Sequence, residues 1–223
     1  MDTLPLQFHQ GLLFVELGSS ERWLLDTGAP TSFGRSSCVS IAGRPFNLGS
    51  DYRGFTVESL SQFIGLPCAG LLGGDILNCF DHIFDANNGQ LIVASDELQH
   101  HGTIVPLELF DRIPIVTARI GSSSYRMCLD TGAELSYLQD ESLQAFPSAG
   151  RFTDFYPFYG HFETDTHLLP VTLGDSVFTL RCGTLPAPLR YLFTYTGTQG
   201  IIGNAVFADQ PVGYFPRRRM LVF

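Results

Sequence analysis

The chain has 223 residues, of which 44% are hydrophobic and 16% are charged, as in folded globular proteins. Its formal net charge of −9 argues against a nucleic acid or an anionic membrane as the main partner, because both need a positive protein surface. The sequence has neither a signal peptide nor the roughly 18 consecutive apolar residues of a membrane-spanning helix, so we expect a cytoplasmic protein.

Short runs of β-branched and aromatic residues, separated by Gly, Pro, Asn and Asp, predict a mainly β protein. In the first half we expect strands at residues 4–8, 11–17, 22–26, 38–42, 53–58, 80–85 and 90–94. Asn88-Gly89 predicts a tight hairpin turn between the last two of these strands. In the second half we expect strands at residues 104–109, 113–120, 125–130, 152–156, 161–164, 168–173, 176–182 and 220–223. Short helices are expected at residues 74–80, 140–145 and 203–209.

The polar stretch ASDELQHHGT, residues 94–103, is the best candidate for a linker. It divides the chain into an N-terminal half, residues 1–98, and a C-terminal half, residues 99–223. We interpret its two histidines as exposed and expect no metal and no cofactor. The basic run Arg217 to Arg219 is interpreted as a solvated turn. The cysteines are interpreted as reduced core residues; they are Cys38, Cys68, Cys79, Cys128 and Cys182.

The two halves repeat one pattern. RWLLDTGAPT, residues 22–31, and RMCLDTGAEL, residues 126–135, each follow a strand and a Gly-Ser turn. Further on, each half has two apolar residues, a Gly and a short helical run, in LLGGDILNCF, residues 71–80, and IIGNAVFADQ, residues 201–210. Because the order is the same twice, we infer a duplicated unit of about 110 residues with a pseudo-twofold axis.

The repeated Asp-Thr-Gly predicts a pair of carboxyl groups. If the two copies meet on the axis, Gly28 and Gly132 let the backbones approach, and Asp26 and Asp130 come within hydrogen-bond distance. Two such groups cannot both ionise, so the pair can activate a water while protonating a carbonyl oxygen. The hydroxyl groups of Thr27 and Thr131 would point toward the backbone of the opposite half. One Asp-Thr-Gly alone is more often a turn, but two in register favour a catalytic site.

Two copies of DTGA after a hydrophobic residue, each followed by LLGG or IIGN and a short helix, resemble the aspartic proteases, either pepsin-like or retropepsin-like. The resemblance implies a bilobal, pseudo-twofold β-barrel fold in which Asp26 and Asp130 are catalytic. It assigns support of the active site to Thr27, Gly28, Thr131 and Gly132. The implied activity is that of an endopeptidase on extended peptide or protein substrates, with apolar residues at the scissile bond and without a cofactor.

The length of each half favours a compact, single-chain, retropepsin-like duplex, for which a monomer suffices. In that architecture the strands at residues 4–8, 90–94, 104–109 and 220–223 should form a shared sheet under the cleft. Asn204 stands where the viral enzymes usually have a cation that braces the dimer.

Proteases of this kind cover the substrate with a β-hairpin flap. In the first half, NLGSDYRGF, residues 47–55, offers a tip with Tyr52. In the second half, DFYPFYGHF, residues 154–162, offers a tip with Phe158, Tyr159 and Gly160. Which of the two hairpins closes on substrate stays open, and packing of these aromatic residues is an equal alternative.

Ala29 and Ala133 stand where many pepsin-like enzymes have a Ser that donates to the catalytic carboxylate. Without that donor the pair should hold its proton to higher pH, which predicts activity in weakly acidic solution. A second hypothesis also stays open, a catalytically silent peptide-binding module with the protease fold. Phosphate binding at GLLGGD, residues 70–75, is disfavoured because the P-loop Lys-Ser/Thr pair is missing.

Overall fold

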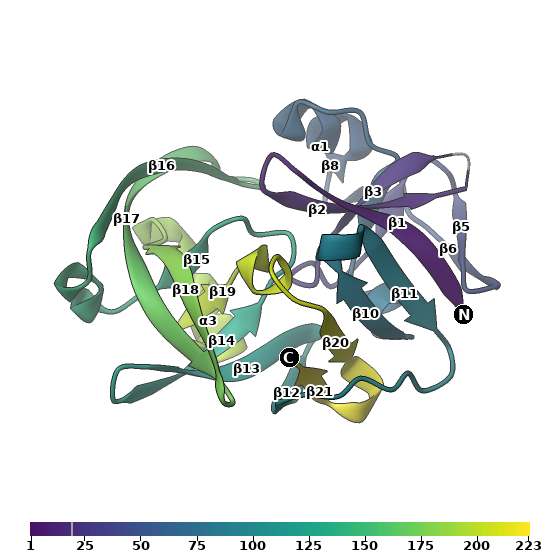
Figure 1. Cartoon of the computed structure of the whole chain (residues 1–223). Coiled ribbons are helices and arrows are strands. Elements are labelled where there is room, and N and C mark those ends of the chain that lie inside the picture. Colours follow the sequence, from purple (N-terminus) through teal and green to yellow (C-terminus); the bar gives the residue numbers. More distant parts are fainter. Residues whose placement is uncertain (19) are drawn as a thin grey trace.

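The computed structural model describes residues 1–18 and 20–223, so Ser19, in the first expected Gly-Ser turn, lies outside the described residues. The chain is mainly β, with a large hydrogen-bonded network of strands and a few short helices (Figure 1). No helix in the described ranges is long and apolar enough to cross a membrane.

The first half begins with the strands β1 (Asp2–His9), β2 (Leu12–Leu17), β3 (Glu21–Leu25), β4 (Phe33–Gly34), β5 (Cys38–Ile41) and β6 (Arg44–Asn47). It continues with β7 (Asp51–Tyr52), β8 (Phe55–Thr56), β9 (Gly70–Leu72), β10 (Asp81–Asp85) and β11 (Gln90–Ala94). Its helical segments are α1 (Val57–Ile64), α2 (Gly74–Leu77) and the 3-10 turn η1 (Ala86–Asn88).

The second half begins with the strands β12 (Ile104–Phe110), β13 (Ile113–Ile120), β14 (Ser123–Leu129), β15 (Ser136–Leu138) and β16 (Ser148–Tyr156). It continues with β17 (Gly160–Leu173), β18 (Ser176–Gly183), β19 (Gly200–Ile202), β20 (Val212–Phe215) and β21 (Met220–Val222). Its helical segments are α3 (Tyr191–Thr196) and the 3-10 turns η2 (Glu141–Ala145), η3 (Ala187–Leu189), η4 (Asn204–Phe207) and η5 (Pro216–Arg218).

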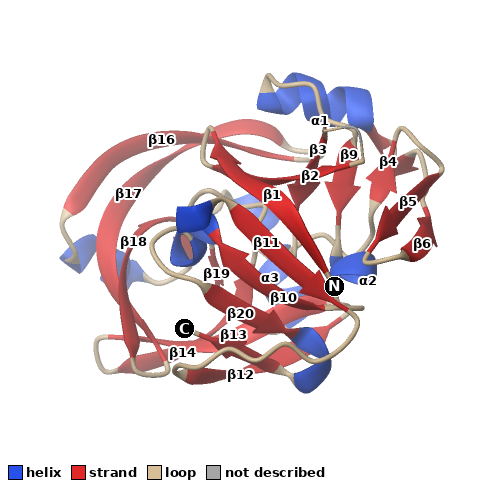
Figure 2. Ribbon diagram, turned by 45° about the vertical axis from the view of Figure 1, so that its right-hand side comes forward, coloured by secondary structure: helices blue, strands red, loops and turns tan. Residues whose placement is uncertain are grey.

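A central sheet joins the two halves (Figure 2). Its strands run in the order β1, β11, β10, β20, β21, β12, so that each half contributes one side. The halves meet where β10 and β20 pair antiparallel, with His82 opposite Tyr214. The four strands that we expected to share a sheet, β1, β11, β12 and β21, all belong to it. We did not predict β20, which lies at its centre, because it has only four residues, one of them a Gly, and lies between Pro211 and Pro216.

Outside the central sheet, the two halves repeat the same pairing. In the first half, β3 runs parallel to β9, while β4 pairs antiparallel with β9. In the second half, β14 runs parallel to β19, and β15 pairs antiparallel with β19. Each Asp-Thr-Gly copy begins at the end of β3 or β14, directly beside β9 or β19. The local pairing therefore places the two copies in equivalent surroundings.

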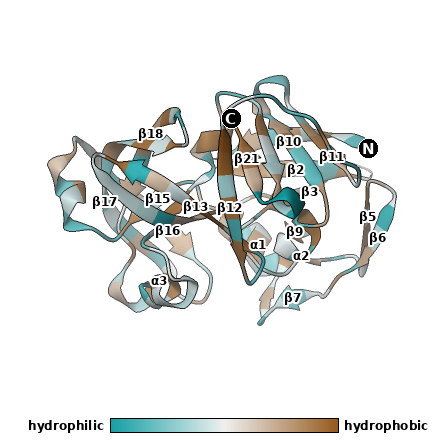
Figure 3. Ribbon diagram, turned by 90° about the horizontal axis from the view of Figure 1, so that it is seen from below, coloured by the Kyte–Doolittle hydropathy of each residue, from teal (hydrophilic) through white to brown (hydrophobic). Residues whose placement is uncertain are grey.

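Three apolar clusters support this frame. The largest contains buried side chains of both halves, such as Leu13, Phe84, Leu129 and Phe207. A second cluster lies between α1 and strands β2, β3 and β9, and a third lies around β15 and α3. Hydrophobic residues are frequent in β12 and β13 (Figure 3), and most residues of β13 are buried, whereas those of β12 alternate between buried and exposed. Because the largest cluster is shared, the halves are not separate hydrophobic units.

Several local predictions were wrong. Residues 57 and 58 belong to α1 rather than to a strand, because Thr56 caps the helix by accepting a hydrogen bond from the Ser59 amide. The tight hairpin turn expected between β10 and β11, by contrast, is confirmed: it consists of η1 followed by Gly89 in the left-handed region. The two strands expected between residues 161 and 173 form one strand, β17. The helices expected at residues 74–80, 140–145 and 203–209 are shorter, as α2, η2 and η4.

The basic run near the C-terminus lies at the turn η5, as expected, but two of its arginines bind a buried carboxylate rather than solvent alone. Arg217 and Arg218 donate to both carboxylate oxygens of Asp81, which is 0% exposed. Both arginines also donate to carbonyl groups of the linker, including that of Leu98. These contacts join the first half, the linker and the second half. All five cysteines are free thiols, and Cys38 is exposed rather than in the core.

Candidate functional site

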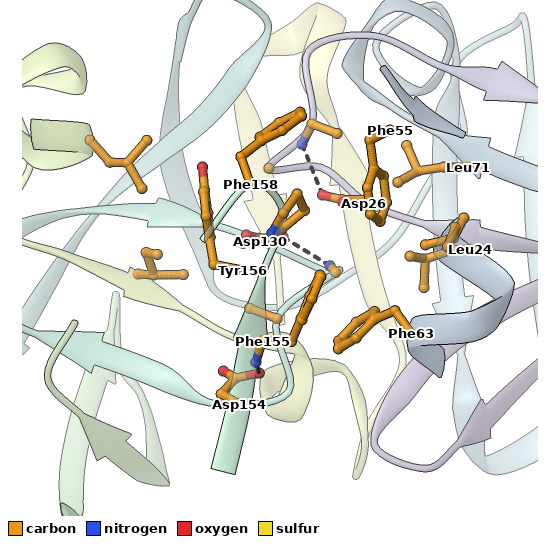
Figure 4. A pocket seen from close by; sticks show the side chains of 18 of the residues that line it. Leu24, Asp26, Phe55, Phe63, Leu71, Asp130, Asp154, Phe155, Tyr156 and Phe158 are labelled. Carbon is orange, nitrogen blue, oxygen red and sulfur yellow. Dashed lines mark hydrogen bonds between the residues drawn. The ribbon is translucent and has the colours of Figure 1, made fainter. Parts of the chain in front are cut away.

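Asp26 and Asp130 lie side by side at the floor of a cavity, each at the end of a strand (Figure 4). The Asp26 amide donates to the Leu72 carbonyl of β9 at 3.0 Å, and the Asp130 amide donates to the Ile202 carbonyl of β19 at 2.9 Å. Each carboxyl group accepts a backbone hydrogen bond, from Ala29 to Asp26 at 2.8 Å and from Gly132 to Asp130 at 2.9 Å. The local frame therefore fixes both side chains.

The glycine of each copy leaves room for the opposite aspartate. A Cβ atom added to Gly28 would overlap the carboxyl group of Asp130, and one added to Gly132 would overlap that of Asp26. Neither glycine has a positive φ, so here the missing side chain matters for space rather than for backbone conformation. Any other residue at either position would push the two carboxyl groups apart.

The threonines connect the two copies across the axis. The Thr27 hydroxyl donates to the Leu129 carbonyl at 2.7 Å, and the Thr131 hydroxyl donates to the Leu25 carbonyl at 2.8 Å. Each hydroxyl also accepts a hydrogen bond from the backbone amide of the other threonine, at 3.0 Å. Both threonines are buried, so these four bonds are shielded from water and hold the strand ends together.

A serine pair, which the sequence analysis missed, supports the loops behind the aspartates. The Gly73 amide donates to the Ser32 hydroxyl at 2.8 Å, and the Gly203 amide donates to the Ser136 hydroxyl at 3.0 Å. Both serines are buried and stand at the same distance after their Asp-Thr-Gly copy. They stand one residue beyond the two quoted segments, so a comparison extended by one residue would have found them.

Asn204 stands at the position where the viral enzymes usually have a cation that braces the dimer, and here it makes hydrogen bonds to both halves. It is buried, and its side-chain amide donates to the Gly11 carbonyl at 2.8 Å and to the Thr131 carbonyl at 3.2 Å. In the first half, the Asn78 side chain makes the matching contact, at 2.7 Å, with the carbonyl of Arg112 in the hairpin loop between β12 and β13. Each half thus holds the hairpin tip of the other half.

The protonation of Asp26 and the protonation of Asp130 depend on each other. Burial raises the pKa of both above the usual value for aspartate, and the negative charge of Asp130 raises that of Asp26 further. The hydrogen bond between them also raises the pKa of Asp26, whereas it lowers that of Asp130. The pair therefore favours a state with one proton. In that state one group can accept a proton from water while the other donates one.

The cavity above the pair has a volume of about 650 Å³. Its first-half wall contains apolar side chains of the second cluster, among them Leu24, Phe55, Phe63 and Leu71 (Figure 4). Its second-half wall contains side chains of the third cluster, such as Tyr137 and Leu192. Of the described residues, no group of three or more His, Cys, Asp or Glu side chains could hold a metal ion. The size and lining suit an extended organic chain.

The long hairpin of β16 and β17 crosses from the second half to the first (Figure 1). Phe155 stacks on Phe63 of α1 with 3.8 Å between the ring centroids, and Phe158 lies 6.3 Å from Phe55. Near the tip, Tyr156 lines the cavity, where burial raises its pKa, with smaller contributions from Tyr191 and the two aspartates. Phe155 and Tyr156 were not predicted as cavity residues, although both stand in the segment DFYPFYGHF.

The flap candidates from the sequence have different positions. Tyr52 and Phe158 line the cavity, one from each hairpin. Tyr159 and Gly160 are not among the described residues that line it. Tyr159 packs edge to face on Phe162, and Gly160, with a φ of +94°, serves the turn. The first hairpin consists of the two-residue strands β7 and β8, so the long hairpin provides most of the cover.

No family model matches the chain, and no curated protein matches it. Among solved structures, the chain is similar to the crystal structure of Basic 7S globulin from soybean, with a TM-score of 0.52 and 14% sequence identity. The similarity covers 98% of this chain and 93% of that chain. At this identity it shows a shared fold alone.

Proposed function

We propose that this protein is an aspartic endopeptidase with a bilobal, pseudo-twofold aspartic-protease fold. The observation that carries the proposal is the pairing of Asp26 and Asp130, which face each other from equivalent strand ends at the floor of a cavity. Both Asp-Thr-Gly copies lie in one chain, so a monomer contains the complete site.

In the proposed reaction, one carboxylate takes a proton from a water molecule. At the same time, the oxygen atom of this water attacks the carbonyl carbon of a peptide bond. The other carboxyl group donates its proton to the carbonyl oxygen. The tetrahedral intermediate then collapses: the C–N bond breaks, and the amine leaves with the proton that the first carboxylate took from water. A hydroxyl group of the intermediate returns its proton to the second carboxylate as the new carboxyl group forms, so the pair again holds one proton. The reaction needs neither a cofactor nor a covalent intermediate.

The surroundings support this chemistry in two ways. The long hairpin lies over the pair and limits the access of water, which strengthens electrostatic interactions below it. The apolar first-half wall suits a large apolar side chain beside the scissile bond. No hydroxyl group stands at Ala29 or Ala133, so we expect the highest activity in weakly acidic solution.

Digestion of a mixed peptide library between about pH 3 and pH 7 tests the proposal. We expect wild-type protein to cleave, and Asp26→Asn and Asp130→Asn each to lower the rate by about a hundredfold or more. Cleavage that survives both substitutions would rule out the pair. A maximum below about pH 3 would contradict the expected pH dependence.

The second candidate function is a catalytically silent peptide-binding module. The stack of Phe155 on Phe63 favours it, because a hairpin held closed would block turnover. Under this alternative, wild-type protein binds peptides from the library without cleaving them, and the two Asn variants bind them equally well. A measured cleavage rate that depends on both aspartates would exclude it.

A further inference from the structure

The two walls of the cavity differ in chemistry at equivalent positions. Phe33 of β4 and Tyr137 of β15 follow their Asp-Thr-Gly copies at the same distance, and both rings are buried. The Phe33 ring packs among apolar side chains of the first half. The Tyr137 hydroxyl instead donates a hydrogen bond to the carboxylate of Asp154 on β16. Of these two equivalent positions, therefore, only the one in the second half has a polar group in its side chain.

Asp154 is a half-buried carboxylate in the wall of the cavity (Figure 4). Its Oδ1 accepts a hydrogen bond from the Phe155 amide at 2.7 Å, and its Oδ2 accepts the bond from Tyr137. Each oxygen retains a free lone pair. The ion pairs formed by the described residues do not include Asp154. A half-buried carboxylate without an ion-pair partner is stabilised when a ligand places a positive charge beside it.

The neighbouring groups do not supply that charge by direct contact. Glu134 and Asp130 lie near enough to interact electrostatically with Asp154, and both are acids. Burial raises the pKa of Asp154, whereas its two hydrogen bonds and the nearby His161 lower it. Arg53 also lines the cavity, but its guanidinium lies 5.3 Å from the ring of Tyr52 in the first half. Arg181 lowers the pKa of Glu134, but its guanidinium donates to Thr166 and to backbone carbonyls and does not line the cavity. The described residues of the second-half wall that line the cavity include acidic side chains and no arginine.

We propose that Asp154 is a specificity-determining residue that binds an arginine or lysine side chain of the peptide on the second-half side of the cavity. The first-half wall then receives a large apolar side chain of the same peptide. This inference rests on the proposed function for its substrate class, and it replaces a preference for apolar residues on both sides of the scissile bond. A guanidinium can bind carboxylate oxygens by charge-assisted hydrogen bonds, which favours arginine.

A binding experiment tests the subsite without relying on cleavage. The Asp26→Asn protein is titrated with pairs of apolar octapeptides that carry arginine or norleucine at one position, moved along the peptide. We expect the arginine peptide to bind about tenfold more tightly at one position. The preference should disappear in Asp26→Asn/Asp154→Asn, which keeps the size of the side chain and one acceptor oxygen.

The matched control is Asp26→Asn/Asp165→Asn, since Asp165 lies on β17 with a side chain that is 76% exposed and pairs with Arg151. This control should retain the tenfold preference. Equal binding of the two peptides at every position, or a preference that survives Asp154→Asn, would overturn the inference. Incubation of wild-type protein with the same peptides separates the two proposals. Absence of cleavage speaks against the proposed function. The ratio of the affinities for the arginine and norleucine peptides alone decides the role of Asp154.

Discussion

The threonine hydroxyls connect the two strand ends, and each satisfies two backbone groups of the opposite half. Replacement of Thr27 by Val keeps the shape but leaves the Leu129 carbonyl and the Thr131 amide buried without this partner. We expect Thr27→Val to lower the free energy of unfolding by about 2–4 kcal/mol, measured by urea denaturation. Thr27→Ser retains the hydroxyl and should cost less than about 1 kcal/mol. Similar losses in both variants would show that the methyl group matters rather than the hydrogen bonds.

The aspartate pair should lower stability at neutral pH. Because the pKa of Asp26 is raised in the folded chain, the folded state binds more protons than the unfolded state above the usual value of 3.8, and stability falls as pH rises. Asp26→Asn should therefore raise the melting temperature at pH 7, with a gain that shrinks as pH falls toward 3.8. Asp165→Asn, on an exposed residue, is the control. A gain independent of pH would contradict the raised pKa.

The hairpin of β16 and β17 is held over the cavity mainly by aromatic contacts, chiefly the Phe63–Phe155 stack. An aromatic pair contributes about 0.5–1.5 kcal/mol beyond its buried area. We expect Phe63→Ala to raise amide hydrogen exchange at residues 155–160 by about threefold to tenfold. Phe178→Ala, which removes a pair with Phe223 at 5.0 Å, should leave exchange at the tip unchanged. Unchanged exchange in Phe63→Ala would mean that other contacts hold the hairpin.

Elements with a local signal could be predicted from the sequence, and those that depend on distant partners could not. The strand before each aspartate was predictable because its apolar run ends at a polar, glycine-containing turn. The central strand β20 was not, because its four residues between two prolines are too short for a pattern, and its pairing with β10 and β21 defines it as a strand. The similar spacing of the two flap segments also concealed a difference, since β7 and β8 lead into α1 whereas β16 and β17 form a long hairpin.

At the scale of the whole molecule, the pairing of the candidate site could be predicted from the repeated Asp-Thr-Gly, on the condition that the two copies meet at the pseudo-twofold axis. The differences between the halves did not follow from it. Asp154 and Tyr156 lie in the cavity because of the length and curvature of one hairpin. No short motif encodes such a position.

The shared core and sheet make the halves interdependent. The largest apolar cluster contains Leu13 of the first half and Leu129 of the second, and β10 pairs with β20. We therefore expect a single thermal transition, with a ratio of calorimetric to van't Hoff enthalpy of about 1. Two separate transitions in differential scanning calorimetry would show that residues 1–98 and 99–223 unfold independently.

Asp81 joins the first half, the linker and the second half. It is 0% exposed, and it binds Arg217, Arg218 and the Leu98 amide of the linker. Loss of one partner of a buried ion pair costs about 3–5 kcal/mol, but Arg217 and Arg218 are partly exposed, with side-chain exposures of 35% and 21%.

We therefore expect Asp81→Asn to lower the free energy of unfolding by about 2–4 kcal/mol, and to increase proteolysis of residues 95–103 because the linker loses its anchor. Glu108→Gln removes an exposed pair with Arg126 and should cost less than about 1 kcal/mol. Urea denaturation and limited proteolysis of both variants measure these effects. If Asp81→Asn is as stable as Glu108→Gln, then the central sheet and the shared core hold the two halves together without this buried charge.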